Sequence, residues 1–305
     1  MIKEGRVKIN MSKATRLAAW RTTGEVLSCG RTVDEQMESI RKYGNHGVSP
    51  VLRAGVLAAH GISKPKDNAK NCIIFGCYRP FTTPFLVRDY IRLLDMLNID
   101  YTYLDHEYCC GVPLAMTTMN SGEQLDNAMS VGREFNQLNL NLAQQKGAIK
   151  LAYCCAGCVH AAKNAFNETS DSHVYIVDLI LDEIEKHHLK IPPTVIGYFE
   201  GCHTFFRNIY SGIRLDWGRY RQRLSKIEGL KIVDLPNNMC CRESAIKIIE
   251  SAVKMNLTKI LCPCSGCYAS LMPASKGKLQ MITLPDLLLQ SLESKKIDES
   301  FKIKK

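Results

Sequence analysis

The sequence predicts an α/β protein made of two pseudo-repeated, Rossmann-like βα units, each with a parallel sheet. Two observations lead to this prediction. One ordered set of cysteine motifs occurs twice along the chain, and each motif follows a short apolar, strand-like run. Segments with apolar residues at helical spacing separate these runs. Because ligand sites in open α/β sheets lie beyond the carboxyl ends of the strands, we expect the cysteines to gather there.

The repeat has the same order in both halves: a Gly-Cys pair, a Cys-Cys doublet, and a Cys-x-x-Cys motif. The first half carries Gly76-Cys77, Cys109-Cys110 and Cys155-Ala156-Gly157-Cys158. The second half carries Gly201-Cys202, Cys240-Cys241 and Cys264-Ser265-Gly266-Cys267. The spacing between motifs differs between the halves, which indicates loops and helices of variable length around a preserved site.

Apolar residues at helical spacing predict helices over residues 84–97, 123–145 and 242–255. Residues 33–43 and 48–60 are also helical in pattern but have no counterpart in the repeat. We therefore expect an N-terminal helical extension at 1–70, a first cysteine-rich domain at 71–192 and a second at 193–305. Pro192-Pro193 is the expected boundary between the two domains. The extension is expected to pack on the core or on a partner.

Composition narrows the class of protein. The chain has 305 residues, 46% of them hydrophobic, which is enough for a full core. No apolar run is long enough to span a membrane, and the N-terminus lacks the apolar stretch of a secretory signal, so a cytoplasmic location is expected. The net charge of +10 is spread along the chain without an Arg/aromatic stripe. This pattern favours a solvated surface over docking to an acidic partner, and it speaks against nucleic-acid binding.

Fourteen cysteines are many for an intracellular protein of this size. Their clustering in doublets and Cys-x-x-Cys pairs favours metal binding or redox work over a disulfide framework. A Cys-x-x-Cys pair at the start of a helix places two sulfurs near free backbone N–H groups, which stabilise thiolate. Five cysteines per half is one more than a tetrahedral zinc site takes, and it suits a multi-iron cluster. Zinc in at least one half and metal-free thiols remain the alternatives.

Several other residues lie next to these motifs. Cys154 and Cys262 flank the Cys-x-x-Cys pairs. Either could substitute as a ligand, but the role of a buried, inert thiol is favoured, as it is for Cys29 and Cys72. His203 directly follows Cys202; it is either a structural histidine or a group that donates a proton to a leaving thiolate or a hydrogen bond to a cluster sulfur. His160 is a weaker candidate for the same roles.

The motif set as a whole resembles the cysteine-rich CCG domain, duplicated as in the B subunit of heterodisulfide reductase and its relatives. The resemblance covers roughly residues 70–290. It implies two noncubane 4Fe-4S clusters that act on a disulfide, a persulfide or protein-bound sulfur. It also implies two partners, a C subunit with cubane iron–sulfur clusters and a flavoprotein A subunit.

Carried over by position, the resemblance implies five ligands in each half. The first site is Cys77, Cys109, Cys110, Cys155 and Cys158, and the second is Cys202, Cys240, Cys241, Cys264 and Cys267. Cys77, Cys110, Cys202, Cys241 and His203 are the candidate catalytic residues.

The predicted function is therefore an oxidoreductase acting on sulfur groups. One departure from the family keeps other functions open: Arg242 follows the second doublet where the family has Gly. The alternatives are an electron-transfer or scaffold subunit with a single working cluster, and a zinc-binding interaction module.

Overall fold

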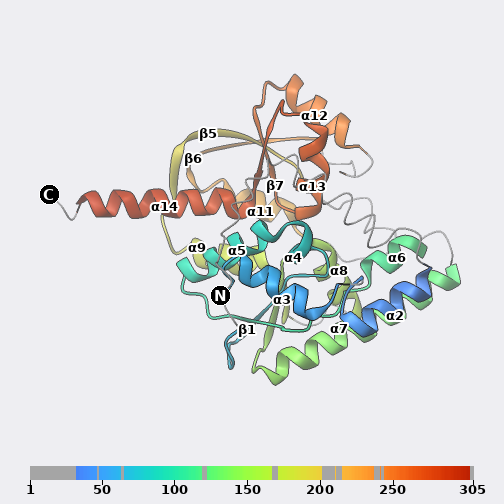
Figure 1. Cartoon of the computed structure of the whole chain (residues 1–305). Helices are drawn as coiled ribbons and strands as arrows, with labels where there is room; N and C mark the ends of the chain where they lie inside the picture. Colours follow the sequence, from blue (N-terminus) through green and yellow to red (C-terminus); the bar gives the residue numbers. More distant parts are fainter. Residues whose placement is uncertain are drawn as a thin grey trace, which may run out of the picture.

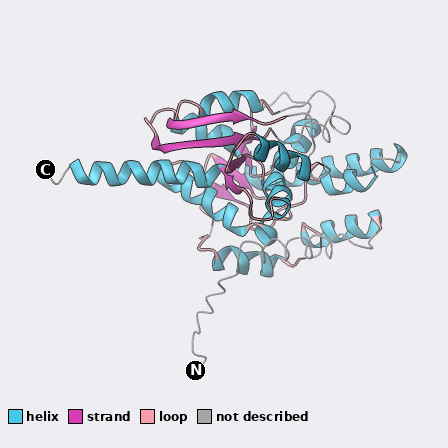
Figure 2. Cartoon of the chain, turned by 90° about the horizontal axis from the view of Figure 1, so that it is seen from above, coloured by secondary structure: helices cyan, strands magenta, loops and turns pink. Residues whose placement is uncertain are grey.

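The computed structural model has α/β architecture with two four-stranded sheets (Figure 1). It describes residues 32–46, 48–62, 65–118, 122–166, 171–200, 210, 215–236, 241 and 244–302. All strand pairs in both sheets are parallel. Figure 2 shows the strands among helices. The predicted fold class is thus confirmed.

The first sheet has the strand order β2-β1-β3-β4. Its strands are β1 (Asn71–Ile74), β2 (Thr102–Tyr103), β3 (Lys150–Tyr153) and β4 (His173–Tyr175). In the central pair Ile74 lies opposite Tyr153, so β1 and β3 end at the same level. The loops that follow β1, β2 and β3 carry the cysteines of the first half. The parallel register therefore brings these loops to one edge of the sheet.

The second sheet repeats this topology in the order β6-β5-β7-β8. Its strands are β5 (Lys190–Tyr198), β6 (Glu228–Asp234), β7 (Lys259–Cys262) and β8 (Gln280–Thr283). Pro192 and Pro193 lie inside β5, where the register with β6 shifts between Lys190 and Thr194. Proline lacks the N–H that a regular ladder needs, so a local irregularity is expected there. The division into domains at these prolines stays a prediction.

The helices of the first half surround its sheet. They are α4 (Arg79–Thr82), α5 (Pro84–Met96), α6 (Val112–Thr118), α7 (Gly122–Gln145), α8 (Ala156–Ala165) and α9 (Ile176–Ile184). In α5 the residues at helical spacing, Leu86, Tyr90, Leu93 and Leu94, are all buried, and Pro84 occupies its first turn. The helices predicted over 84–97 and 123–145 are observed to within one residue at each end.

The second half contributes α11 (Trp217–Leu224), α12 (Ala245–Lys254), α13 (Ser265–Ala274) and α14 (Leu284–Lys302). The helix predicted from residue 242 begins at Ala245, and residues 242–243 lie outside the described part. The first turns of α14 pack on α5 of the first half and on β5, while its end runs out from the body of the molecule (Figure 1). Arg92 and Glu293 form an ion pair of 2.6 Å across this contact. The two halves are thus joined by packed helices.

Two described helices lie in the predicted N-terminal extension, α2 (Val33–Tyr43) and α3 (Pro50–Ala59). A capping box between Thr32 and Glu35 starts α2, and the Ser49 side chain caps α3. Met37 and Ile40 of α2 are buried in a cluster with Phe135 of α7. The described part of the extension therefore packs on the first half of this chain. In the described ranges, no helix combines the length and the apolar character needed to cross a membrane.

Candidate metal centre

The structure places the described cysteines near the carboxyl ends of the strands. No disulfide joins any of the cysteines that the structure describes. In the first half all five predicted ligands are described, and they come from the loops after β1 and β2 and from the start of α8. Three separate segments therefore supply sulfur to one edge of the sheet.

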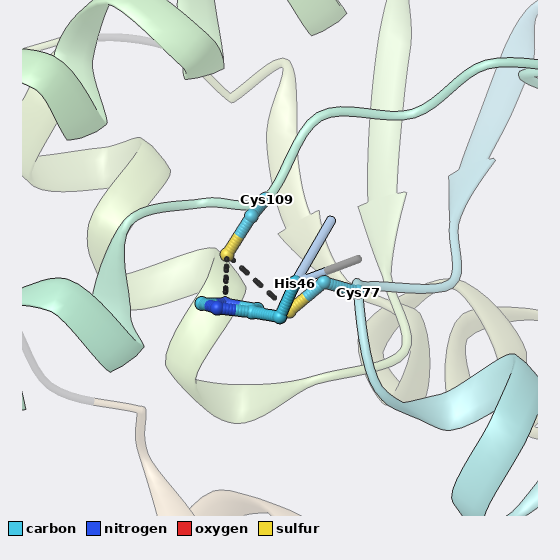
Figure 3. Close-up of side chains that lie close together, drawn as sticks. All are labelled: His46, Cys77 and Cys109. Atoms are coloured by element: carbon cyan, nitrogen blue, oxygen red, sulfur yellow. Dashed lines mark hydrogen bonds between the residues drawn. The ribbon is translucent and has the colours of Figure 1, made fainter. Parts of the chain in front are cut away.

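The five sulfur atoms of the first half form a continuous series of contacts. The thiol of Cys109 donates to Cys77 Sγ at 3.3 Å (Figure 3). Cys109 also contacts Cys110, Cys110 contacts Cys158, and Cys158 contacts Cys155. The order in space is therefore Cys77, Cys109, Cys110, Cys158, Cys155. We call this group the first sulfur set.

The pKa values of four of these cysteines shift in alternating directions along the set. The hydrogen bond from Cys109 and the neighbouring His46 lower the pKa of Cys77 to about 6, although burial opposes them. Contacts with Cys109 and Cys158 likewise lower the pKa of Cys110. Cys109 and Cys158 donate in these contacts, and their pKa values are raised. The lowered and raised pKa values thus alternate over these four cysteines because adjacent negative charges would repel one another, and a bound cation would favour loss of the remaining protons.

The turn after β1 brings Cys77 close to the Cys-x-x-Cys motif. Gly76 has a φ of 85°, and a Cβ atom there would lie 3.3 Å from Cys158 Sγ. The Gly76 and Phe75 amides donate to the carboxylate of Glu107, at 2.5 and 3.2 Å. Arg53 Nη2 pairs with the same carboxylate at 2.7 Å, and both side chains are buried. A buried ion pair therefore joins α3, the Gly76 turn and the loop that carries the first doublet.

Helix α7 holds the doublet itself. The side chain of Asn139 accepts from the Tyr108 amide at 2.8 Å and donates to the Tyr108 carbonyl at 2.7 Å. Asn136 donates to the Cys110 carbonyl at 3.1 Å. Gly111, with a φ of 83°, packs so closely on α7 that a Cβ would lie 2.6 Å from Gly132 Cα. The backbone on both sides of the doublet is therefore fixed to one helix.

The Cys-x-x-Cys motifs of the two halves have the same local geometry. Cys155 is the N-cap residue of α8 with φ −118° and ψ 126°, and Cys264 is the N-cap residue of α13 with φ −114° and ψ 137°. Neither N-cap side chain makes a capping hydrogen bond. The cysteine sulfur is therefore not used for capping and can serve the site, next to a helix N-terminus that favours negative charge.

The described cysteines of the second half also meet. Cys267 contacts both Cys241 and Cys264, and these contacts raise its pKa. We call these three residues the second sulfur set. Cys202, His203 and Cys240 lie outside the described residues. The remaining cysteines fit the inert role expected of them: burial raises the pKa of Cys72, Cys154 and Cys262. Cys29 also lies outside the described part.

Arg79, at the start of α4, lies between the two sulfur sets, and no sequence motif indicated it. Burial opposes its charge, but negative charge on the nearby sulfurs of Cys155, Cys158 and Cys264 raises its pKa. Its Nε is buried and has no hydrogen-bond partner among the described residues. Tyr175 is close to both sets and donates to the Pro263 carbonyl at 2.6 Å. A cation thus faces sulfur atoms from both halves.

Two histidines also approach the sulfur atoms. His46, in the loop between α2 and α3, places Nε2 3.5 Å from Cys109 Sγ, and it was not among the predicted site residues. The donor atoms of His46, Cys77 and Cys109 all lie within 4.8 Å of one another. His160 is buried in α8 and its Nδ1 contacts the Ala156 carbonyl at 2.5 Å, as a structural histidine would.

This donor set fits an iron–sulfur cluster. Five thiols in contact exceed the four ligands of one zinc ion, and the guanidinium of Arg79 would offset the negative charge of a thiolate-bound cluster. The first sulfur set, and the three described cysteines of the second sulfur set, are therefore the residues that would hold metal.

Comparisons with known proteins relate this chain to a cysteine-rich domain family and to subunits of a heterodisulfide reductase. Residues 73–162, which include the whole first sulfur set, match the cysteine-rich domain family CCG. The D subunit of dihydromethanophenazine:CoB–CoM heterodisulfide reductase from Methanosarcina acetivorans is 26% identical over 253 residues, with 74% of this chain and 59% of that protein covered. The corresponding protein from Methanosarcina mazei is 27% identical, with 63% and 49% covered. The chain thus spans about half the length of these relatives.

A solved structure, an aspartate racemase homologue from Pyrococcus horikoshii OT3, gives a TM-score of 0.32 at 12% identity, covering 74% of this chain and 98% of that one. So weak a likeness carries no functional meaning. The similarities are therefore to the cysteine-rich domain family CCG over residues 73–162 and to D subunits of heterodisulfide reductase, whereas the sequence predicted a resemblance to the B subunit.

Proposed function

We propose that this chain is the iron–sulfur catalytic subunit of a heterodisulfide-reductase-like complex, equivalent to its B subunit. It holds two noncubane 4Fe-4S clusters and reduces or forms a disulfide or persulfide bond. Its partners are a C subunit with cubane clusters and a flavoprotein A subunit, and the complex works in the cytoplasm. The similarity to heterodisulfide reductase subunits supports the reaction class.

One observation carries the proposal: three segments of the first half bring five cysteine sulfurs into one continuous series. A buried structural thiol needs no such neighbours, and a dithiol for simple exchange needs only two. Iron–sulfur clusters are held by several thiolates, and adjacent sulfurs can serve different irons. Cys77, Cys109, Cys110, Cys155 and Cys158 are the proposed ligands of the first cluster.

The second half supplies the second set of ligands. Cys241, Cys264 and Cys267 are in contact, and Cys202 and Cys240 complete the proposed set. The position of Arg79 near Cys158 and Cys264 supports a site in which the two sets act together. A bound cluster would supply single-electron chemistry.

The chain's own residues bind and position the reacting sulfur. Cys77, Cys110, Cys202 and Cys241 are the proposed catalytic cysteines. His203 donates a proton to a leaving thiolate, and Arg79 stabilises the negative charge on sulfur between the two sets.

Metal analysis of anaerobically purified protein tests the proposal. Filling both sites with four-iron clusters gives about eight irons per chain and a visible absorption spectrum. Stoichiometric zinc with almost no iron would refute the proposal and favour the zinc-binding interaction module, which is colourless.

Cysteine substitutions then separate the catalytic subunit from an electron-transfer or scaffold subunit with one working cluster. Cys110→Ala and Cys241→Ala should each remove about half of the iron and abolish disulfide turnover in the complex. Cys72→Ala is the matched control, because Cys72 is a buried cysteine of β1 outside the first sulfur set. If Cys241→Ala keeps full iron and activity while Cys110→Ala loses both, the single-cluster alternative is correct.

A further inference from the structure

The loop between α2 and α3 brings a histidine into the first sulfur set. His46 Nε2 lies 3.5 Å from Cys109 Sγ, and Cys109 Sγ lies 3.3 Å from Cys77 Sγ. Figure 3 shows the Cys109 sulfur next to the imidazole, with dashed lines that join it to His46 and to Cys77. His46 is only 1% exposed. The contact is therefore made in the interior, where water does not compete for the sulfur.

The backbone of this loop is built into the site. Gly44 accepts a hydrogen bond of 2.7 Å from the Cys109 amide. Its φ is 74°, and a Cβ there would lie 2.3 Å from the Glu107 carbonyl oxygen. Only glycine permits both this conformation and this close approach. The loop therefore docks on the backbone that leads into the doublet, two residues before His46.

Side-chain hydrogen bonds hold the same loop from within. Asn45 Nδ2 donates to the carbonyls of Tyr43 at 3.0 Å and Val48 at 2.8 Å, and Asn45 Oδ1 accepts from the Val48 amide at 2.7 Å. Ser39 Oγ donates to the Asn45 carbonyl at 3.2 Å. These contacts hold the described residues of the loop, 44–46 and 48–49, through their own side chains and backbone. The position of His46 thus follows from the fold of the N-terminal helices.

The ring orientation is fixed as well. The imidazole stacks on Tyr78, with centroids 5.0 Å apart and planes 9° from parallel. Tyr78 follows Cys77 directly in the chain. A stacked ring cannot turn freely, so its Nε2 stays aimed at sulfur. This is the arrangement of a preorganised hydrogen-bond donor, and hydrogen bonds to ligand sulfur are among the factors that set the potential of an iron–sulfur cluster.

We propose that His46 is a positioning residue of the first site, which donates a hydrogen bond through Nε2 to the Cys109 sulfur and so raises the reduction potential of the cluster held there. The inference rests on the proposed iron–sulfur function. Donation withdraws electron density from the thiolate and favours the reduced, more negative state of the cluster. The second site has its own loops, so its potential should not depend on His46.

Two variants at residue 46 test this role. His46→Phe keeps a flat ring that can stack on Tyr78 but removes the donor. His46→Gln keeps an N–H near the position of Nε2. The control is His173→Phe, because His173 is a buried histidine of the same half that stacks on Phe166, with centroids 4.5 Å apart, and contacts Tyr153 Oη through Nδ1 at 2.8 Å. Among the described residues, it makes no hydrogen bond to a cysteine sulfur.

The readouts are iron content and the midpoint potential of each site in EPR-monitored titrations of the purified full chain. We expect His46→Phe to keep its iron and to lower one of the two potentials, His46→Gln to restore most of that shift, and His173→Phe to change neither. An unchanged potential in His46→Phe, or an equal shift in His173→Phe, overturns the inference. Loss of iron from both residue-46 variants also overturns it, because the histidine is then a ligand. If the unaltered chain binds no iron, the proposed function itself fails.

Discussion

The two halves share strands and cysteine turns but differ in what supports them. Both sheets have the same topology. Cys155 and Cys264 occupy the N-cap positions of α8 and α13 with nearly the same backbone angles. Between the doublet and the Cys-x-x-Cys motif, however, the first half inserts α6 and the long α7, whereas the second half has the shorter α12 as its described helix. The shared part is therefore the part that positions sulfur.

The first doublet loop is also held by helices from outside its own sheet. Arg53 of α3 pairs with Glu107 in the interior, and Gly44 accepts from the Cys109 amide. Among the described residues of the second half, the ion pairs are more exposed; Lys190 and Glu228, for example, keep 64% and 48% of their side-chain surface. The first site is therefore stabilised by buried polar contacts that the described part of the second half does not repeat. We expect the two sites to respond to mutation separately.

The largest expected effect comes from Arg53→Met. The substitution leaves the Glu107 carboxylate buried without its partner, which costs about 3–5 kcal/mol. It also frees α3 and loosens the Gly76 turn, whose amide donates to that carboxylate. Chemical denaturation should show the loss of stability, and metal analysis should show iron loss from the first site.

Lys190→Met is the control in the second half. Its ion pair with Glu228 is exposed, so the loss should stay below about 1 kcal/mol and iron should be unaffected. An equal loss of folding stability in Arg53→Met and Lys190→Met would show that the two halves do not differ in how their ion pairs stabilise them.

The next effect concerns Gly111, which packs on Gly132 of α7. Gly111→Ala adds a Cβ 2.6 Å from Gly132 Cα and forces a non-glycine residue to a φ of 83°. The expected cost is about 2–4 kcal/mol, with loss of the first cluster and retention of the second.

The control is Gly55→Ala in α3, where a Cβ would meet no atom within 4 Å. There the better helix propensity of alanine should stabilise the chain slightly. Loss of iron from both sites in Gly111→Ala would contradict the separation of the two halves.

The strands that precede the cysteine motifs in both halves could be predicted from the sequence. Each described cysteine motif follows a strand as expected, because the repeat of apolar run and cysteine marks the carboxyl edge of a parallel sheet. The strands β4 and β8 were not predicted. They are three and four residues long, they carry no cysteine motif after them, and their pairing with β3 and β7 is a tertiary contact.

The contacts that hold the first doublet loop could not be predicted either, because they too are tertiary contacts. Arg53 meets Glu107 across 54 positions of sequence, and His46 meets Cys109 across 63. Neither pair has a motif, since no fixed spacing joins them. Arg79 stands only two residues after Cys77, but its approach to Cys264 depends on how the two halves pack.

A moderate effect is expected at Asn139, which binds both backbone groups of Tyr108 from α7. Asn139→Ala leaves the partly buried amide and carbonyl of Tyr108 without this partner, at a cost of about 1–3 kcal/mol. Iron should exchange faster from the first site, as measured by chelator challenge, and at an unchanged rate from the second. Asn141→Ala is the control on the same helix, because Asn141 is exposed and pairs with Gln137. A matching acceleration in Asn141→Ala would mean that α7 as a whole, and not this contact, retains the cluster.

The smallest effect is expected from substitution of Arg79, which should change the midpoint potentials of both sites rather than of one. Its guanidinium faces Cys155 and Cys158 of the first set and Cys264 of the second. Removing the cation in Arg79→Met disfavours the more negative, reduced state at both sites. About 1 kcal/mol of Coulomb energy at each site corresponds to a fall on the order of 40 mV in both midpoint potentials. Arg79→Lys should recover part of this fall, because the charge remains.

Arg92→Met is the matched control for this last prediction. Arg92 also links the halves, through Glu293, but its pair is about half exposed. Arg92→Met should therefore leave the midpoint potentials of both sites unchanged. A shift confined to the first site in Arg79→Met would show that the charge of Arg79 acts within one half, and the two sulfur sets would then be electrostatically independent. A shift at both sites would mean that a single first-half arginine couples two centres whose supporting loops are otherwise separate.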